Sequence, residues 1–245
     1  MPFTAKSGKF NASINVVEFG TGDKAVKIGG ENVFPLYSFD AAIENAPKVG
    51  IEITDFGMEH EPECIKKYYE GCATLADMAR KAASMEGVDF LSFRMEGGDP
   101  NGANKSTEEL IGELKEIADA VDLPLVVCGC KNVEKDAELF SKAAEALNGK
   151  NAVILSAKEE NYKTVGAAAG LAYKQIVGAE SAVDINLAKQ LNVLISQLGV
   201  DSKSVVMNVG SAAVGYGFEY VISTMDRVKA AALQQGDANL QMPII

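Results

Sequence analysis

Short apolar runs alternate with helical segments along most of this chain, and this alternation constrains the fold more than any other feature. Strands that are apolar throughout, each followed by a helix, are typical of a parallel sheet with helices on its faces. The alternation therefore predicts an α/β fold. The strand-like runs occupy residues 49–54, 88–95, 125–128, 152–155, 175–178, 205–209 and 242–245.

Two of the intervening helices carry clear boundary signals. Ser106 and Glu109 are the two ends of a capping-box sequence, and apolar residues follow at positions 110, 114, 117 and 121. A second apolar stripe, at positions 187, 191, 194, 195 and 198, begins after Asp184 and stops at Gly199. Glycine suits the left-handed conformation in which helices commonly end.

The spacing of the strands favours a barrel of the TIM (β/α)8 type over an open doubly wound sheet. Strand starts recur about every 32 residues, and no dinucleotide-binding fingerprint follows the first strand. We expect the barrel over residues 48–245 and expect it to be truncated, because the chain stops within the seventh strand-like run. Residues 1–47 are expected to form an N-terminal β-hairpin and entry segment, with β-rich stretches at 15–19 and 25–28.

Composition narrows the range of partners. The chain has 23 basic and 34 acidic residues and a net charge of −11, which opposes binding to nucleic acid or to anionic membranes. No apolar run approaches the roughly 18 residues that span a bilayer, and the first residues lack the apolar core of a signal peptide. We therefore expect a cytoplasmic protein whose four cysteines are reduced.

The glycine-rich segment 208–220 is the strongest candidate for a ligand site. It links an apolar strand to a helix, where α/β proteins commonly receive ligands. Glycines allow the backbone to approach a ligand closely, and an aromatic ring between them offers a flat apolar face. The segment lacks the Gly-Lys-Ser or Gly-Lys-Thr of a phosphate loop, and a turn that serves packing alone is the alternative. Its candidate binding residues are Asn208, Gly210, Ser211, Gly215, Tyr216 and Gly217.

The other strand ends supply further polar candidates. Arg94 either binds an acidic group of a ligand or pairs with Glu96. Neighbouring acids such as Glu159 and Glu160 either perform acid–base chemistry or interact with a helix start. The candidate ligand-binding residues of these loops are Asp55, Arg94, Glu96, Ser156, Asn161, Tyr162, Asp184 and Asn186.

Histidine and cysteine give little support to catalysis or metal binding. His60 is the only histidine, so a serine or cysteine hydrolase lacks its usual base, and we expect His60 at the surface. Cys128 and Cys130 can point the same way, but structural zinc and iron–sulfur sites generally use four ligands. Buried, unreactive thiols are expected instead, and no catalytic residue or metal ligand is assigned.

Several of these loops, in order, resemble those of the small (delta) subunit of the corrinoid iron-sulfur protein, which belongs to the carbon monoxide dehydrogenase/acetyl-CoA synthase system. The resemblance runs from about residue 10 to the last residue and therefore does not depend on one short motif. The segments that carry it are 34–39, 50–55, 96–104, 124–130, 160–163, 184–186 with 189–192, and 215–220.

The resemblance implies a barrel subunit that pairs with a larger subunit carrying an iron–sulfur cluster and a corrinoid-binding domain. The corrinoid (cobalamin) would be held between the two subunits, with no iron–sulfur cluster on this chain. Such a complex takes a methyl group from methyltetrahydrofolate through a separate methyltransferase and passes it to acetyl-CoA synthase in the reductive acetyl-CoA pathway. The small subunit would cap the cofactor without catalysing the transfer itself.

A methyltetrahydrofolate-dependent corrinoid methyltransferase on the same barrel is the alternative. The chain has Asn208-Val209 where the resembled family commonly has Asp-Pro, and Ala212 and Ala213 where it commonly has glycines. These departures weaken the expectation that the chain binds folate itself. A barrel lyase would need a Schiff-base lysine within a strand, and none of the predicted strands contains one.

Overall fold

The computed structural model of the protein describes residues 10–34 and 43–245. Most of the motif at 34–39, and the first residues that bear on the signal peptide, lie outside these ranges. Two compact units divide the chain. The larger consists of Glu18–Val26 and Lys48–Gly178, and the smaller of Met1–Val17, Lys27–Pro47 and Ala179–Ile245. The sequence-based boundary at residue 47 stays a prediction.

Six parallel strands form the main sheet in the order β3-β4-β5-β6-β7-β8. Residues Thr54, Arg94, Cys128 and Leu155 lie opposite one another across its first four strands, so the carboxyl ends of these strands meet at one edge. The strands are β3 (Gly50–Thr54), β4 (Phe90–Arg94), β5 (Leu125–Cys128), β6 (Val153–Ala157), β7 (Ile176–Glu180) and β8 (Val205–Asn208). The predicted α/β class and the first six predicted strands are confirmed.

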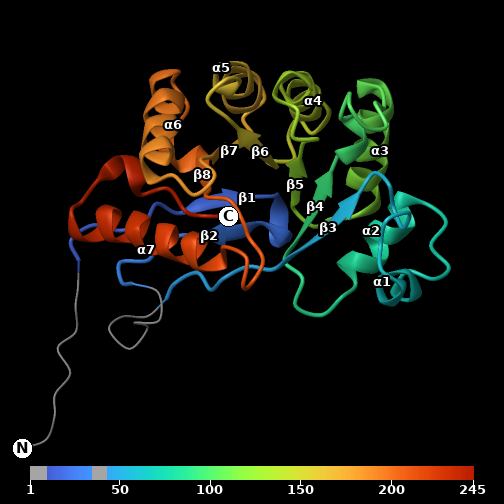
Figure 1. Ribbon diagram of the computed structural model, residues 1–245, viewed down its shortest axis with the longest axis horizontal. Helices are drawn as coiled ribbons and strands as arrows, with labels where there is room; N and C mark the ends of the chain where they lie inside the picture. Colours follow the sequence, from blue (N-terminus) through green and yellow to red (C-terminus); the bar gives the residue numbers. More distant parts are fainter. Residues whose placement is uncertain (1–9, 35–42) are drawn as a thin grey trace, which may run out of the picture. The chain divides into compact units, whose positions relative to one another are not determined.

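Helices follow the strands as the alternation predicts. In the larger unit, α3, α4 and α5 lie in a row along one face of β4–β6 (Figure 1). The helices are α1 (Glu63–Tyr68), α2 (Leu75–Ala83), α3 (Thr107–Ala120), α4 (Val133–Ala146), α5 (Tyr162–Val165), α6 (Ile185–Gln197) and α7 (Phe218–Gln234). The short α5 continues into a π-helix over Gly166–Ala172.

The prediction of a seventh strand at residues 242–245 is wrong. Residues 242–245 make one isolated parallel bridge, between Met207 and Ile244. Pro243 has no N–H to donate and contributes only its carbonyl, which accepts from the Met207 N–H at 2.8 Å. The described residues thus form a six-stranded parallel sheet, and the eight-stranded TIM barrel stays a prediction.

The N-terminal hairpin is confirmed. Strands β1 (Val17–Phe19) and β2 (Val26–Ile28) pair as a separate two-stranded sheet. Phe19 is fully buried, and its ring contacts that of Phe90 edge-on at 5.7 Å between centroids. This aromatic contact anchors the hairpin end to strand β4 within the larger unit.

Helix boundaries follow the cap signals closely, whereas one buried face differs from its prediction. The Ser106 hydroxyl caps α3 by accepting from the Glu109 N–H, and Leu110 and Leu114 are fully buried as expected. In α6 the most buried side chains include Ala188 and Asn192, while the predicted Leu187 and Leu194 are only half-buried. No helix among residues 10–34 and 43–245 is long and apolar enough to cross a membrane.

Candidate functional site

Asp55, which directly follows β3, is buried and bound by neighbouring groups of the protein. Its side chain is completely buried, and its two carboxylate oxygens accept from the Gly97 N–H at 2.9 and 3.1 Å. The Lys105 ammonium lies 3.0 Å from Oδ2 and also donates to the Asp55 carbonyl at 2.9 Å. The sequence makes Asp55 a candidate ligand-binding residue, but in the structure its carboxylate is bound by groups of the protein itself.

Lys105 and Glu113 complete this cluster, and the sequence analysis missed both. Lys105 Nζ lies 3.2 Å from Glu113 Oε1, while Glu113 Oε2 is buried without a partner among the described residues. Burial raises the pKa of Glu113, although Lys105 opposes this. Burial also disfavours the charge of Lys105, but contacts with Asp55 and Glu113 outweigh it, so its pKa is raised. The charged ammonium therefore links Asp55, at the end of β3, to Glu113 on α3.

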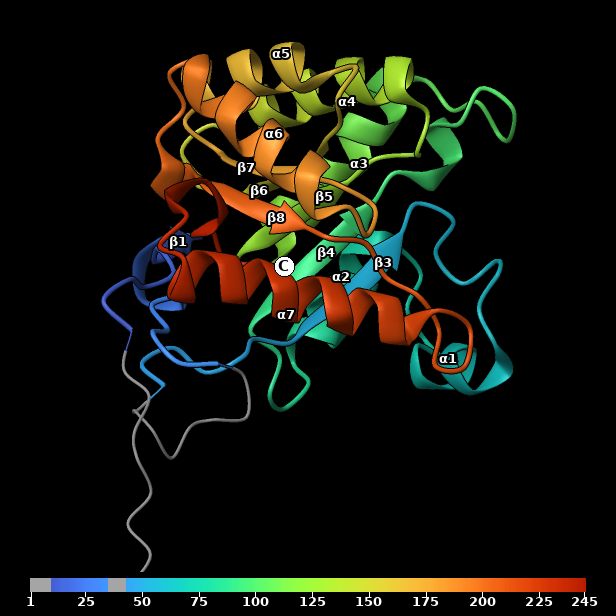
Figure 2. The ribbon, with the colours of Figure 1, turned by 60° about the vertical axis from the view of Figure 1, so that its left-hand side comes forward.

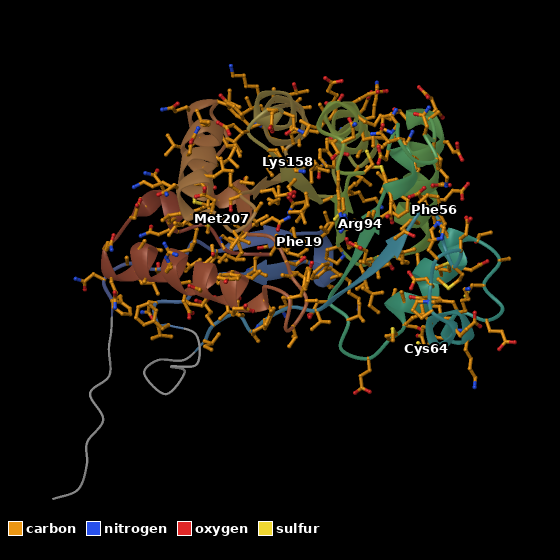
Figure 3. The ribbon with its side chains drawn as sticks, in the orientation of Figure 1. Phe19, Phe56, Cys64, Arg94, Lys158 and Met207 are labelled. Carbon is orange, nitrogen blue, oxygen red and sulfur yellow. The ribbon has the colours of Figure 1, made fainter. Side chains whose placement is uncertain are left out.

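Phe56 and His60 lie beside this cluster. The Lys105 ammonium is 5.5 Å from the centroid of the Phe56 ring, and the His60 ring contacts Phe56 edge-on at 4.9 Å. Figure 3 labels Phe56 in the turn after β3. His60 itself is exposed, as expected from the sequence.

Arg94, the last residue of β4, pairs with Glu52 and not with Glu96. Its Nε and Nη2 donate to the two Glu52 carboxylate oxygens at 2.9 and 2.8 Å. This hydrogen bonding raises the pKa of Arg94 above its ordinary value. Glu52 and Arg94 lie on adjacent strands and point to the same face of the sheet. The alternation of side chains between the two faces of a strand is the sequence signal that could have indicated this pair. Glu96 is left exposed at the strand end.

The candidates after β6 also make contacts inside the larger unit. Asn161 is buried: its Oδ1 accepts from the Lys158 N–H at 2.8 Å, and its Nδ2 donates to the Val133 carbonyl at 3.3 Å. Ser156 is buried in β6, and Tyr162 is half-buried with Lys163 Nζ 5.9 Å from its ring centroid. Of these three, Tyr162 presents the most surface.

Cys128 and Cys130 are buried, as predicted, and Cys130 has a defined partner. Its thiol donates to Asp136 Oδ1 at 3.2 Å, and its N–H donates to the same oxygen at 2.7 Å. Burial raises the pKa of Asp136, and burial chiefly raises the pKa of Cys130 to about 11. The thiol is therefore protonated at neutral pH and resists reaction.

We expect Cys130 in the folded protein to resist iodoacetamide at pH 8 while the exposed Cys64 reacts. Because the pKa of Cys130 is raised by folding, its contribution to stability is present at neutral pH and is lost as the pH rises from about 9 to about 11. The difference in urea midpoint between wild type and Cys130→Ala should therefore shrink between pH 8 and pH 10.5. Alkylation of both cysteines at equal rates at pH 8 would contradict this.

The smaller unit holds the candidates that follow β7. Asp184 caps α6, because its Oδ1 accepts from the N–H groups of Asn186 and Leu187 at 2.8 and 3.1 Å. Both Asp184 and Asn186 are exposed. The carboxylate thus serves the helix start, and the Asn186 side chain faces solvent.

The glycine-rich segment 208–220 joins β8 to α7 within the smaller unit (Figure 2). Asn208 Oδ1 accepts from the Gly210 N–H at 3.0 Å, which closes the first turn after the strand. Gly215 and Gly217 have φ of +79° and +105°, so both positions require the left-handed backbone that glycine adopts readily. Ser211 and Gly215 are exposed, whereas Gly210 and Gly217 are half-buried.

This segment carries the largest concentration of exposed apolar side chains among the described residues. Tyr216 is 87% exposed and Val214 is 85% exposed. Side chains at the start of α7 extend the exposed surface. They are Phe218, Tyr220 and Ile222. Several exposed apolar side chains within one short segment mark an interaction surface more often than a packing turn.

Within each unit, some candidate residues make contacts with the protein and others are exposed to solvent. The side chains of Asp55, Asn161 and Asp184 bind backbone groups of the protein, and Asp55 also pairs with Lys105. Glu96, Asn186 and Tyr216 direct theirs to solvent. No group of three or more histidine, cysteine or acidic side chains within residues 10–34 and 43–245 is arranged to hold a metal ion.

Comparison with known proteins identifies relatives along almost the whole chain. Residues 16–245 match the family described as CO dehydrogenase/acetyl-CoA synthase delta subunit. The acetyl-CoA decarbonylase/synthase complex subunit delta of Methanothermobacter thermautotrophicus is 33% identical over 93% of this chain and 58% of its own length. The subunit of the same name from Methanopyrus kandleri is 34% identical, over 92% of this chain and 56% of its own length.

A third relative, from Methanocaldococcus jannaschii, carries the same name and is 31% identical over 96% of this chain and 59% of its own length. The chain thus spans somewhat more than half the length of these curated relatives. The match of residues 16–245 nevertheless covers far more than one motif or one unit of the fold. The chain belongs to the CO dehydrogenase/acetyl-CoA synthase delta subunit family.

Proposed function

We propose that this chain is a non-catalytic subunit of a methyl-carrying complex, in which it caps a corrinoid shared with a larger iron–sulfur subunit. The family match over residues 16–245 is the observation that carries this proposal. A methyltransferase would deliver the methyl group from methyltetrahydrofolate, and acetyl-CoA synthase would receive it. When bound, the corrinoid supplies the cobalt centre that holds the methyl group between these two reactions.

The glycine-rich segment fits a large, flat and partly apolar ligand. Tyr216 is almost fully exposed, so its ring is free to lie against such a ligand without leaving a packed core. Gly215 has no other atom within 4 Å of the position that a Cβ would take, so the backbone there is open to close approach. Exposed amide and hydroxyl groups at Asn186 and Ser211 can hydrogen-bond peripheral amides of a corrin.

These residues orient and shield the ligand, and none is suitably arranged for acid–base chemistry. Asp184 and Asn208 both hold backbone N–H groups of their own loops, which fixes the loops in place. The chain's part in the reaction would then be to position the cofactor and exclude water from one side of it.

Replacing Tyr216 by serine is expected to weaken corrinoid retention by about tenfold, because loss of one aromatic stacking surface costs roughly 1 to 1.5 kcal/mol. The tagged complex would be isolated from the natural host, and its cobalt and iron contents measured after dialysis. Cobalt should fall while iron and thermal stability stay unchanged, since Tyr216 is 87% exposed.

Met85→Ser is the matched control, because Met85 is also an exposed apolar residue but lies beyond α2. A wild-type complex without cobalt would overturn the proposal. Micromolar binding of methyltetrahydrofolate by the isolated chain would do the same, since it would favour a methyltransferase.

A further inference from the structure

Two consecutive residues in the turn after β7 adopt a backbone conformation that their side chains disfavour. Ala182 has a φ of +44° and Val183 a φ of +69°. Glycine and asparagine enter this left-handed region readily, whereas a β-branched side chain there is a genuine outlier because its Cβ crowds the backbone. The turn is therefore strained, and contacts around it must hold it in place.

Ser181, the first residue of the same turn, adds a second unfavourable feature. It is only 1% exposed, and its hydroxyl has no hydrogen-bond partner within residues 10–34 and 43–245. A buried hydroxyl without a partner lowers stability. Strain and an unsatisfied polar group within three residues are typical of segments that a fold retains for function.

The end of β8 and the start of the glycine-rich segment hold one side of this turn. The Ser181 N–H donates to the Asn208 carbonyl at 3.0 Å, and the Val183 N–H donates to the Val209 carbonyl at 2.7 Å. A Cβ at Gly210 would lie 3.6 Å from Cγ2 of Val183, so the turn packs directly on this glycine. All of these residues belong to the smaller unit except none from the larger one.

Helix α7 contacts the other side of the turn. The buried Thr224 hydroxyl lies 2.9 Å from the Tyr220 carbonyl and 3.4 Å from the Val183 carbonyl, so its single hydrogen is shared between the two. The N–H of Val183 thus binds the beginning of the glycine-rich segment, and its carbonyl lies beside the helix that follows the segment. One strained residue contacts the segment at both ends.

We infer that the turn 181–184 is a positioning element, in which Val183 holds the two ends of the glycine-rich segment in one arrangement for ligand binding. The inference rests on the proposed function for the identity of the ligand. Glycine at position 183 would relieve the strain but would also admit many other conformations, whereas valine is stiff once its surroundings hold it. The strain is then the cost of a preorganised binding segment.

The test measures the mobility of the segment and its hold on the corrinoid separately. In the tagged complex, hydrogen–deuterium exchange of the peptide covering residues 205–217 reports mobility, and the rate of cobalt loss during dialysis reports retention. Val183→Gly should accelerate both about threefold to fivefold, the factor that matches the backbone freedom gained with glycine. Val183→Asn should keep both near wild type, because asparagine favours the left-handed conformation.

Lys174→Gly is the matched control. Lys174 is also a non-glycine residue at positive φ, +54°, but it is exposed and belongs to the larger unit. This variant should leave both rates at the wild-type values.

Unchanged exchange or unchanged cobalt loss in Val183→Gly, with the wild-type complex loaded, would overturn the inference and leave the proposed function standing. Equal acceleration in Val183→Asn would also overturn it, since the valine side chain and not the backbone conformation would then be responsible. A wild-type complex without cobalt would overturn the proposed function, and the exchange rates would still decide whether the turn fixes the segment.

Discussion

Replacing Asp55 by alanine is expected to lower the free energy of unfolding by about 3 to 5 kcal/mol, the usual cost of removing one partner from a buried ion pair. The substitution leaves the Gly97 N–H without its acceptor and removes the carboxylate that compensates Lys105. An unsatisfied buried donor alone costs roughly 1 to 3 kcal/mol. Urea unfolding at pH 7, followed by circular dichroism, measures the loss.

Asp77→Ala supplies the comparison. Asp77 forms a capping box with Thr74 and an exposed ion pair with Arg80, so its loss should destabilise the protein much less than the loss of Asp55. Equal losses in the two variants would contradict the structural role given to Asp55. Asp55→Asn should fall between them, because an amide retains one acceptor for Gly97 but not the negative charge facing Lys105.

The strand ends of the sheet could be predicted from sequence because local patterns determine them. Runs of apolar residues, bounded by glycine and polar residues, predicted the ends of β3 to β8 to within two residues. Cap signals did the same for α3, which begins directly after Ser106. Residues 242–245 were predicted less well, since an apolar pattern does not register that Pro243 lacks an N–H.

Pairings between distant residues could not be predicted in this way. Arg94 is 42 residues from Glu52, and Lys105 is 50 residues from Asp55. Each pairing depends on strand order and register, which a single sequence does not specify. Gln175 is a similar case: its buried amide accepts from Ala152 and donates to Leu147.

The same limit explains why the polar candidates divide into two groups. A carboxylate or amide at a strand end looks alike in sequence whether it binds a ligand or a backbone N–H. Asp55 and Asn161 bind backbone groups inside the protein, whereas Tyr216 is exposed to solvent. The residues most useful for binding are therefore those whose polar or aromatic groups the fold leaves unused, supported by neighbours that the fold fixes in place.

Gly97→Ala is expected to cost about 2 to 3 kcal/mol, the upper range for overpacking a tightly packed site. A Cβ at position 97 would overlap Oδ2 of Asp55 and would lie 3.0 Å from Cδ of Lys105. The carboxylate would have to move away from the Gly97 N–H and the Lys105 ammonium that hold it. Urea unfolding measures this cost, and Gly112→Ala is the control.

Gly112 lies on the exposed face of α3 with no atom near its would-be Cβ, so alanine there should raise stability by up to about 1 kcal/mol. A double-mutant cycle then isolates the cause of the Gly97 effect. In the Asp55→Ala background the overlapping oxygen is absent, so Gly97→Ala should cost less than about 1 kcal/mol, a coupling of roughly 2 kcal/mol between the two positions. Additive losses would show that position 97 requires glycine for a reason other than its contact with Asp55, whereas the expected coupling would identify the pair as one packed unit joining the ends of β3 and β4.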